Sequence, residues 1–166
     1  MADATLCVVD MQIYFSASQE EWLIQNILRE IRGAKRRGFG IVFLEYNGCG
    51  PTDKRLLGEV MPDYDRWTRR LKSDGDGAPQ VVDAVDLHGF SKKHFIITGV
   101  ETEACVCDTI NGLALLAPDA RITVPADCVN MLRRNNRRKG IKSFYRLPQV
   151  SLTHRKRRLP ANKYEG

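Results

Sequence analysis

The sequence lacks the long apolar runs of a membrane protein. Its 166 residues contain no stretch close to the roughly 20 apolar residues that a membrane-spanning helix needs. The acidic start Met1-Ala2-Asp3 has no basic flank of the kind that marks a secretory signal. Proline and glycine are sparse, at 7 and 13 residues, and 43% of the chain is apolar, which excludes collagen-like and disordered proteins. We therefore expect a soluble, cytoplasmic protein that does not contact a membrane.

Cysteine is too scarce and too irregularly placed for a disulfide framework. The number of cysteines is odd, and they are Cys7, Cys49, Cys105, Cys107 and Cys128. A reducing cytoplasm keeps such thiols free. We expect no disulfide bonds, so each thiol is either a small core side chain or a group available for chemistry.

The net charge of +6 is unevenly distributed along the chain. Residues 132–166, called the basic segment below, carry 12 Lys or Arg residues and one acidic residue. Residues 1–131 carry 14 basic and 19 acidic residues. A basic cluster of this kind can contact the phosphates of nucleic acid or an acidic protein. We favour two simpler explanations, namely a solvated helix face with a tail, or contact with the acidic body of another subunit.

Short apolar runs alternate with amphipathic patterns along the chain. Buried strands are predicted at residues 5–9, 41–44, 95–98, 121–124 and 149–153. Helices are predicted at residues 22–37, 81–87, 102–116 and 129–142, and a mostly irregular excursion at 46–79. This alternation predicts a single α/β domain over residues 1–166, with a mostly parallel, Rossmann-like sheet between helices on both faces. Such an arrangement is a three-layer αβα fold.

Two residues stand where a parallel sheet binds its ligands, beyond the carboxyl ends of the strands. Asp10 follows the first predicted strand, and Cys105 lies near the start of the helix after the third. With Thr102 as the N-cap, Cys105 falls in the first helical turn, where unpaired N–H groups and the helix dipole favour an anion. That position lowers the pKa of a thiol and offers donors to an oxyanion. The alternatives are a buried structural cysteine and an aspartate that caps a turn.

These residues and their neighbours resemble the isochorismatase-like cysteine hydrolases, which include nicotinamidases, N-carbamoylsarcosine amidases and ureidoacrylate amidohydrolases. The run VVDMQ at residues 8–12 is similar to the opening strand of that family. The run ITGVETEACV at residues 97–106 is similar to its nucleophile motif, Gly-Val-x-Thr-x-x-Cys-Val. Lys72 lies 33 residues before Cys105, about where the family keeps a catalytic lysine. The resemblance extends from the first strand to residue 127.

The resemblance implies a catalytic triad of Asp10, Lys72 and Cys105. Asp10 takes the thiol proton and returns it to the leaving amine, while Lys72 stabilises the charged pair. The thiolate of Cys105 attacks an amide carbon and forms a thioester, which water hydrolyses. A cis peptide bond between Val100 and Glu101 is implied too, with the backbone amides of Glu101 and Cys105 forming the oxyanion hole.

The retained cysteine and the positions of the histidines narrow the reaction that the resemblance implies. Relatives that cleave the vinyl ether of isochorismate manage without this cysteine, so Cys105 favours C–N cleavage of a small amide or ureido substrate. Nicotinamidases hold a divalent metal with an Asp and several His between the first and third strands. Here the histidines are His88, His94 and His154, and none lies within residues 1–87. We expect no metal and no cofactor, and a homo-oligomer, as is common among relatives.

Four residues that follow predicted strands are candidates to line a substrate pocket. They are Tyr14, Phe15, Asn47 and Trp67. For Phe15 and Trp67, ordinary core packing or an oligomer contact is an equal alternative. A second hypothesis for the whole protein is a catalytically idle scaffold whose basic segment binds nucleic acid or an acidic protein. The joint presence of Asp10, Lys72 and Cys105 favours the enzyme, because an idle scaffold needs none of the three.

Overall fold

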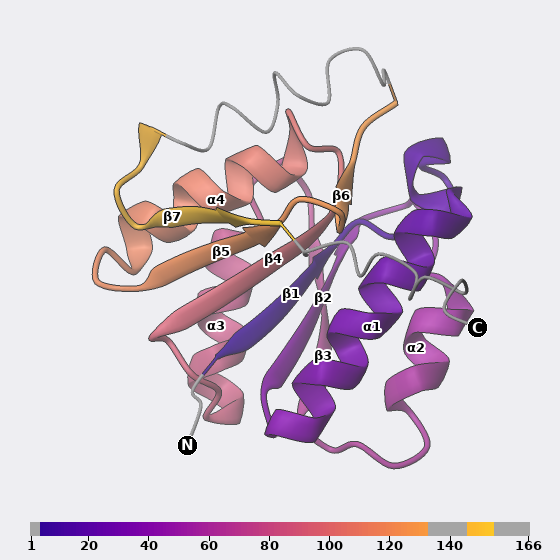
Figure 1. Cartoon of the computed structure of the whole chain (residues 1–166), viewed down its shortest axis with the longest axis horizontal. Coiled ribbons are helices and arrows are strands. Elements are labelled where there is room, and N and C mark those ends of the chain that lie inside the picture. The colour runs from indigo at the N-terminus through magenta and orange to yellow at the C-terminus, as the bar shows by residue number, and fades with distance from the viewer. Residues whose placement is uncertain (1–3, 133–145, 155–166) are drawn as a thin grey trace, which may run out of the picture.

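The computed structural model describes residues 4–132 and 146–154, and its centre is a parallel sheet (Figure 1). The strand order is β3-β2-β1-β4-β5-β7, and β6 pairs with the end of β4. All of these strand pairs are parallel. The strands are β1 (Thr5–Val9), β2 (Gly40–Tyr46), β3 (Trp67–Lys72), β4 (His94–Val100), β5 (Arg121–Pro125), β6 (Val129–Asn130) and β7 (Val150–Thr153).

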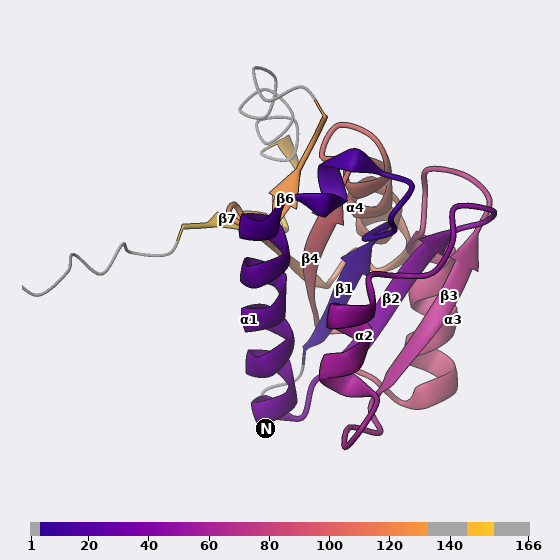
Figure 2. The same ribbon diagram turned by 90° about the vertical axis from the view of Figure 1, so that its right-hand side faces the viewer.

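Helices cover both faces of the sheet (Figure 2), which confirms the predicted three-layer α/β fold. One face carries α1 (Glu21–Arg37) and α2 (Lys54–Val60), and the other carries α3 (Ala78–His88) and α4 (Cys105–Leu116). A short 3-10 helix, η1 (Ser16–Gln19), precedes α1. The predicted end of α1 at residue 37 is also confirmed, and Gly38 is its C-cap. Gly38 has φ 68°, and its N–H donates to the carbonyl groups of Ala34 and Lys35.

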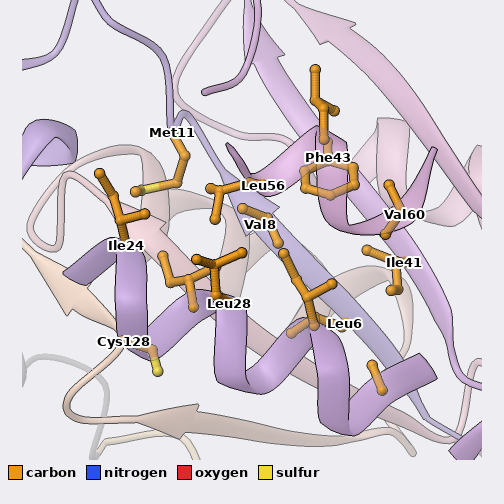
Figure 3. Packing of buried hydrophobic residues seen from close by; sticks show 14 of the residues in the cluster. Leu6, Val8, Met11, Ile24, Leu28, Ile41, Phe43, Leu56, Val60 and Cys128 are labelled. Atoms are coloured by element: carbon orange, nitrogen blue, oxygen red, sulfur yellow. The ribbon is translucent and has the colours of Figure 1, made fainter. Parts of the chain in front are cut away.

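Alternation along the buried strands divides the core into two clusters. Leu6 and Val8 of β1 face α1 and α2, where they pack with residues such as Leu28 (Figure 3). Cys7 and Val9 face α3 and α4. Because both faces of β1 are covered, the strand is apolar throughout, and this produced the clear signal in the sequence. Within the described ranges, no helix is long and apolar enough to span a membrane.

The prediction of an irregular excursion at residues 46–79 was wrong, because this segment contains α2 and β3. Asp53 caps α2 by accepting a hydrogen bond of 2.8 Å from the N–H of Arg55, and the helix buries an apolar face. Strand β3 lies at one edge of the sheet and pairs only with β2 among the described strands. An edge strand is only partly buried, so its sequence WTRRLK contains no apolar run.

Two helix boundaries also differ from the predictions. Thr102 is not the N-cap of α4, which begins at Cys105; the Thr102 hydroxyl instead donates to the carbonyl of Asn130 at 2.9 Å. The helix predicted at residues 129–142 begins as strand β6, because Val129 and Asn130 pair with the end of β4. Residues 133–142 of that prediction lie outside the described residues.

Candidate active site

The carboxyl edge of the sheet brings Asp10, Lys72 and Cys105 together. Asp10 follows β1, Lys72 ends β3, and Cys105 begins α4 just after β4. The ammonium Nζ of Lys72 lies 2.9 Å from Oδ2 of Asp10, and the two side chains are 0% and 1% exposed. The Cys105 thiol lies close enough to the same carboxylate for each of the two groups to shift the pKa of the other. Three ionisable groups from three segments of the chain therefore form one largely buried cluster.

The turn after β1 fixes the position of Asp10. Its φ is 50°, in the left-handed region that Asp tolerates better than most residues. The N–H of Asp10 donates to the carbonyl of Leu44 on β2 at 3.0 Å, and its own carbonyl accepts from the N–H of Gln12 at 2.8 Å. The backbone of Asp10 is thus held from both sides, so the carboxylate stays at the edge of the sheet.

Lys72 is a buried cation with several partners. Besides Asp10, its ammonium donates to the carbonyl of Asp74 at 3.0 Å and lies 4.6 Å from the centre of the Tyr46 ring. An unpaired buried ammonium costs several kcal/mol of desolvation, and these partners offset that cost. The cluster is built to hold a positive charge beside a carboxylate and a thiol.

The pKa of the Cys105 thiol is raised to about 11, mainly by burial and further by the neighbouring Asp10 carboxylate, while Lys72 opposes the shift. The expected lowering by the helix N-terminus was therefore wrong for the resting protein. Burial also raises the pKa of Asp10, and the hydrogen bond from Cys105 and the charge of Lys72 oppose that shift. At neutral pH, Cys105 is a thiol in contact with a base of raised proton affinity.

The nucleophile loop begins with the cis peptide bond between Val100 and Glu101 that the resemblance implied. The Glu101 carbonyl accepts from the N–H groups of Ala104 and Val106, both at 3.1 Å. Its carboxylate accepts from the N–H of Leu132 at 2.9 Å, and burial raises its pKa. Glu101 thereby ties the nucleophile loop to the residue that begins the basic segment.

The four predicted pocket residues do not all lie near the cluster. Asn47 is exposed and adjacent to the site, since its N–H donates to the Lys72 carbonyl at 2.9 Å. Tyr14 is 73% exposed in the loop after β1, with its ring edge-on to Phe15, which packs against the core. Trp67 is not brought to the cluster, because it begins β3 while Lys72 ends that strand.

Trp67 instead has the core role that was its alternative. Its ring lies 6.0 Å from that of Phe43 in an edge-to-face contact. It also borders a shallow cavity of about 480 Å³ on the edge strand, together with Glu45, Thr68, Arg69 and Leu71. The predicted substrate contact of Trp67 is therefore corrected to a packing role, because strand direction separates the two ends of β3.

Two residues near the cluster were not singled out by the sequence, Gln12 and Tyr46. Gln12 is fully buried, and its side-chain amide binds the N–H and the carbonyl of Tyr46 at 2.7 and 3.0 Å, and the carbonyl of Gly50. This joins the loops that follow β1 and β2. Gln12 lies within the VVDMQ run, so the sequence contained a signal for it. Tyr46 could not be found in this way, because only the strand register places it beside Lys72.

His88 and His94 lie away from this cluster. His88 stacks on Phe90, and His94 begins β4, at the opposite end of that strand from the nucleophile loop. Arg121 donates to Nδ1 of His94 at 2.9 Å, and burial lowers the pKa of His94 to about 4. Among the residues that the structure describes, no three His, Cys, Asp or Glu side chains form a group that fits a metal ion.

Comparisons with known proteins agree with this architecture. A family model described as the isochorismatase domain matches residues 4–154. The fold is similar to that of MAR1 ribonuclease from Caenorhabditis elegans, with 20% identity, a TM-score of 0.77, and coverage of 91% of this chain and 77% of that one. It is also similar to the nicotinamidase SaPncA from Staphylococcus aureus, with 19% identity, a TM-score of 0.76, and coverage of 92% and 99%.

A further solved structure of the same fold is the octameric YcaC hydrolase of unknown specificity from Escherichia coli. It shares 20% identity with this chain at a TM-score of 0.72. The matched region covers 92% of this chain and 75% of the YcaC chain. The sequence has no significant match among curated proteins. At these identities the solved structures establish the shared fold.

Proposed function

This chain belongs to the isochorismatase family of hydrolases, and from that premise we propose that it cleaves the C–N bond of a small amide or ureido compound with Cys105 as the nucleophile. The observation that carries the proposal is the buried contact of Asp10 with both Lys72 and the Cys105 thiol. A carboxylate buried beside a thiol and an ammonium has little structural value, since an apolar trio would pack without a desolvation cost. The arrangement suits proton transfer from sulfur.

The proposed reaction proceeds in two halves. Asp10 accepts the proton of Cys105 as Sγ attacks the carbonyl carbon, and a tetrahedral oxyanion forms. Asp10 then gives that proton to the leaving nitrogen, the C–N bond breaks, and a thioester remains. Water attacks the thioester while Asp10 accepts its proton, and the C–S bond breaks to release the acid. Asp10 then returns that proton to Sγ, which restores the thiol. Lys72 stays protonated throughout and offsets the negative charge that passes between Sγ and Asp10.

The backbone amides of Glu101 and Cys105 are proposed as the oxyanion hole. The N–H of Cys105 belongs to the first residue of α4, where backbone donors have no acceptor one helical turn earlier. A hole of this kind contributes about 10²–10³ in rate per donor. Asn47, Tyr14 and Phe15, from the loops after β2 and β1, are proposed to contact the substrate beyond the cluster.

The test is a search for thiol-dependent turnover. Purified protein is incubated with a panel of small primary amides and N-carbamoyl compounds, and ammonia release is measured. In parallel, aldehyde analogues of the same amides are added, because a thiolate adds to them as it would to the amide carbon. We expect ammonia from at least one compound, and a covalent mass increase on the peptide containing Cys105. Neither ammonia nor an adduct across the panel would contradict the proposal.

The basic segment supports a second candidate, nucleic-acid binding. The observations in its favour are the charge of residues 132–166 and the similarity of the fold to a ribonuclease. Direct phosphate contacts would make affinity fall steeply with salt, by about 10³–10⁵ between 50 and 200 mM for six to ten contacts. We expect instead weak binding of RNA and DNA oligonucleotides, little changed when Arg155, Lys156, Arg157 and Arg158 are replaced by Gln. Fluorescence anisotropy at the two salt concentrations measures this.

A nanomolar affinity at 50 mM salt that is lost in the four-residue variant would favour the second candidate. The homo-oligomer and the cytoplasmic location expected from the sequence stay predictions. A precedent for the first is the octameric YcaC hydrolase, which shares this fold.

A further inference from the structure

The ammonium of Lys72 is enclosed on one side by an aromatic ring. Polar partners surround the rest of Nζ, namely Asp10 at 2.9 Å, the Asp74 carbonyl at 3.0 Å and the Cys105 thiol. The ring of Tyr46 lies 4.6 Å from Nζ. The negative face of an aromatic ring attracts a cation, and most strongly where water is excluded. The Lys72 side chain is 0% exposed, so water is excluded here.

Tyr46 is held in this position by its own contacts. It ends β2, and its Cα is the register partner of that of Lys72 on β3. Its backbone N–H and carbonyl both bind the buried side chain of Gln12, at 2.7 and 3.0 Å. Its hydroxyl donates to the carbonyl of Ser73, directly after Lys72, at 3.1 Å. The ring therefore cannot turn away from Nζ without loss of the hydroxyl contact.

We infer that Tyr46 is a positioning residue, which holds the Lys72 ammonium directed at Asp10 and Cys105 through a cation–π contact. The inference rests on the proposed function, since it concerns the cluster that would perform it. Tyr46 itself does not exchange a proton or bond to substrate in this scheme. It acts through Lys72, which in turn stabilises negative charge on Sγ.

Other charged groups around the ammonium limit the effect that loss of the Tyr46 ring can have. Asp10 faces it from the end of β1, and Asp76 of the loop after β3 senses the charges of Lys72, Asp74 and Asp108. These carboxylates also favour the charged ammonium, so Lys72 does not depend on the ring alone. Loss of a desolvated cation–π contact alone corresponds to about a thirtyfold change in an equilibrium constant, and the carboxylates reduce this effect. We therefore expect loss of the Tyr46 ring to slow the reaction of the Cys105 thiol without abolishing it.

The experiment measures the alkylation rate of Cys105 by iodoacetamide across roughly pH 6–10, with peptide mass spectrometry to separate it from the other thiols. Tyr46→Phe keeps the ring and loses the Ser73 contact, and we expect its rates to stay within about threefold of wild type. Tyr46→Leu loses the ring, and we expect about tenfold slower alkylation at neutral pH with the profile displaced to higher pH. The slower rate and the displaced profile of Tyr46→Leu both follow from an ammonium that is held less firmly beside Sγ.

Tyr64→Leu is the matched control for the loss of a partly buried tyrosine. The Tyr64 hydroxyl donates to the carbonyl of Phe39, in the layer of α1 and α2, so this variant lowers the unfolding temperature and leaves the Cys105 profile unchanged. A Tyr46→Leu profile that coincides with wild type overturns the inference, as does a Phe variant that loses as much as the Leu variant.

If Tyr46→Leu does not fold, Tyr46→Met gives the same readout with an unbranched side chain. Alkylation needs no substrate, so the result stands whether or not amide hydrolysis is found. Failure of the inference and failure of the proposed function are therefore separate outcomes.

Discussion

Replacement of Cys105 by Ala is expected to lower kcat for the amide substrate by about 10⁴- to 10⁶-fold, the range found when single members are removed from a catalytic triad. The physical reason is that Asp10 and Lys72 form no bond to the substrate. Without Sγ no thioester forms. The Asp10 carboxylate cannot take its place as the nucleophile, because Asp10 is only 1% exposed. The measurement is steady-state ammonia release by wild type and variant on the best substrate of the panel.

Cys107→Ala is the control, because it changes the same atom type two residues further along α4. Residues two apart on a helix do not share a face, so Cys107 does not meet Asp10 as Cys105 does. We expect kcat within about threefold of wild type for this variant. Turnover that survives Cys105→Ala, or an equal loss in both variants, would mean that the hydrolysis does not pass through the Cys105 thiol.

The cluster itself could be anticipated from the sequence because two of the strands that lead to it, β1 and β4, are largely apolar and buried. The runs that precede Asp10 and Cys105 are buried on both faces, so they identify themselves as strands of a covered parallel sheet. Topology then requires that residues after such strands meet at one edge. Lys72 is different, because it ends an edge strand with little apolar content. Its place came from the resemblance and not from a pattern.

What the sequence could not provide was the balance of energies within the cluster. The position of Cys105 at a helix N-terminus predicted a lowered pKa, but burial and the Asp10 carboxylate outweigh the helix in the folded chain. Burial depends on the packing of segments far apart in sequence. The same applies to Thr102, whose hydroxyl binds Asn130 across 28 residues and so does not cap α4. Tyr46 was missed because the β2–β3 register, and no local pattern, brings its ring to Lys72.

The largest effect on stability is expected from Lys72→Met, which leaves the Asp10 carboxylate buried without its cation. Removal of one partner from a buried ion pair destabilises a protein by about 3–5 kcal/mol. The two side chains are 0% and 1% exposed, so water does not compensate at this site. Urea denaturation at neutral pH measures the free energy of unfolding, with Lys35→Met as the control. Lys35 pairs with Asp63, whose side chain is 71% exposed, and we expect a loss of about 1 kcal/mol or less.

The double variant Asp10→Asn, Lys72→Met separates the charge from the packing. It removes both ions, so no charge is left buried without a partner, and Asn tolerates the positive φ of position 10. We therefore expect the double variant to be more stable than Lys72→Met and to be inactive. A double variant as unstable as Lys72→Met would show that the lysine contributes through packing and not through its charge.

The pH dependence of the single variant follows from the direction of the Asp10 shift. Burial raises the pKa of Asp10 in the folded protein, and Lys72 opposes that shift, so Lys72→Met raises the folded-state pKa further. A group whose folded pKa lies above its unfolded value contributes its stability in full below the unfolded pKa. That contribution is lost as the pH rises through the folded pKa.

Lys72→Met should therefore be least stable at high pH and approach the double variant as the pH falls and Asp10 becomes protonated. Measurement against the double variant cancels the titration of the other carboxylates, because those are the same in both proteins. A gap in unfolding free energy that stays constant from neutral to acidic pH would contradict an ionised Asp10 in the folded variant. Ionisation of Asp10 would then depend on the charge of Lys72, and only an ionised Asp10 can accept the thiol proton of Cys105.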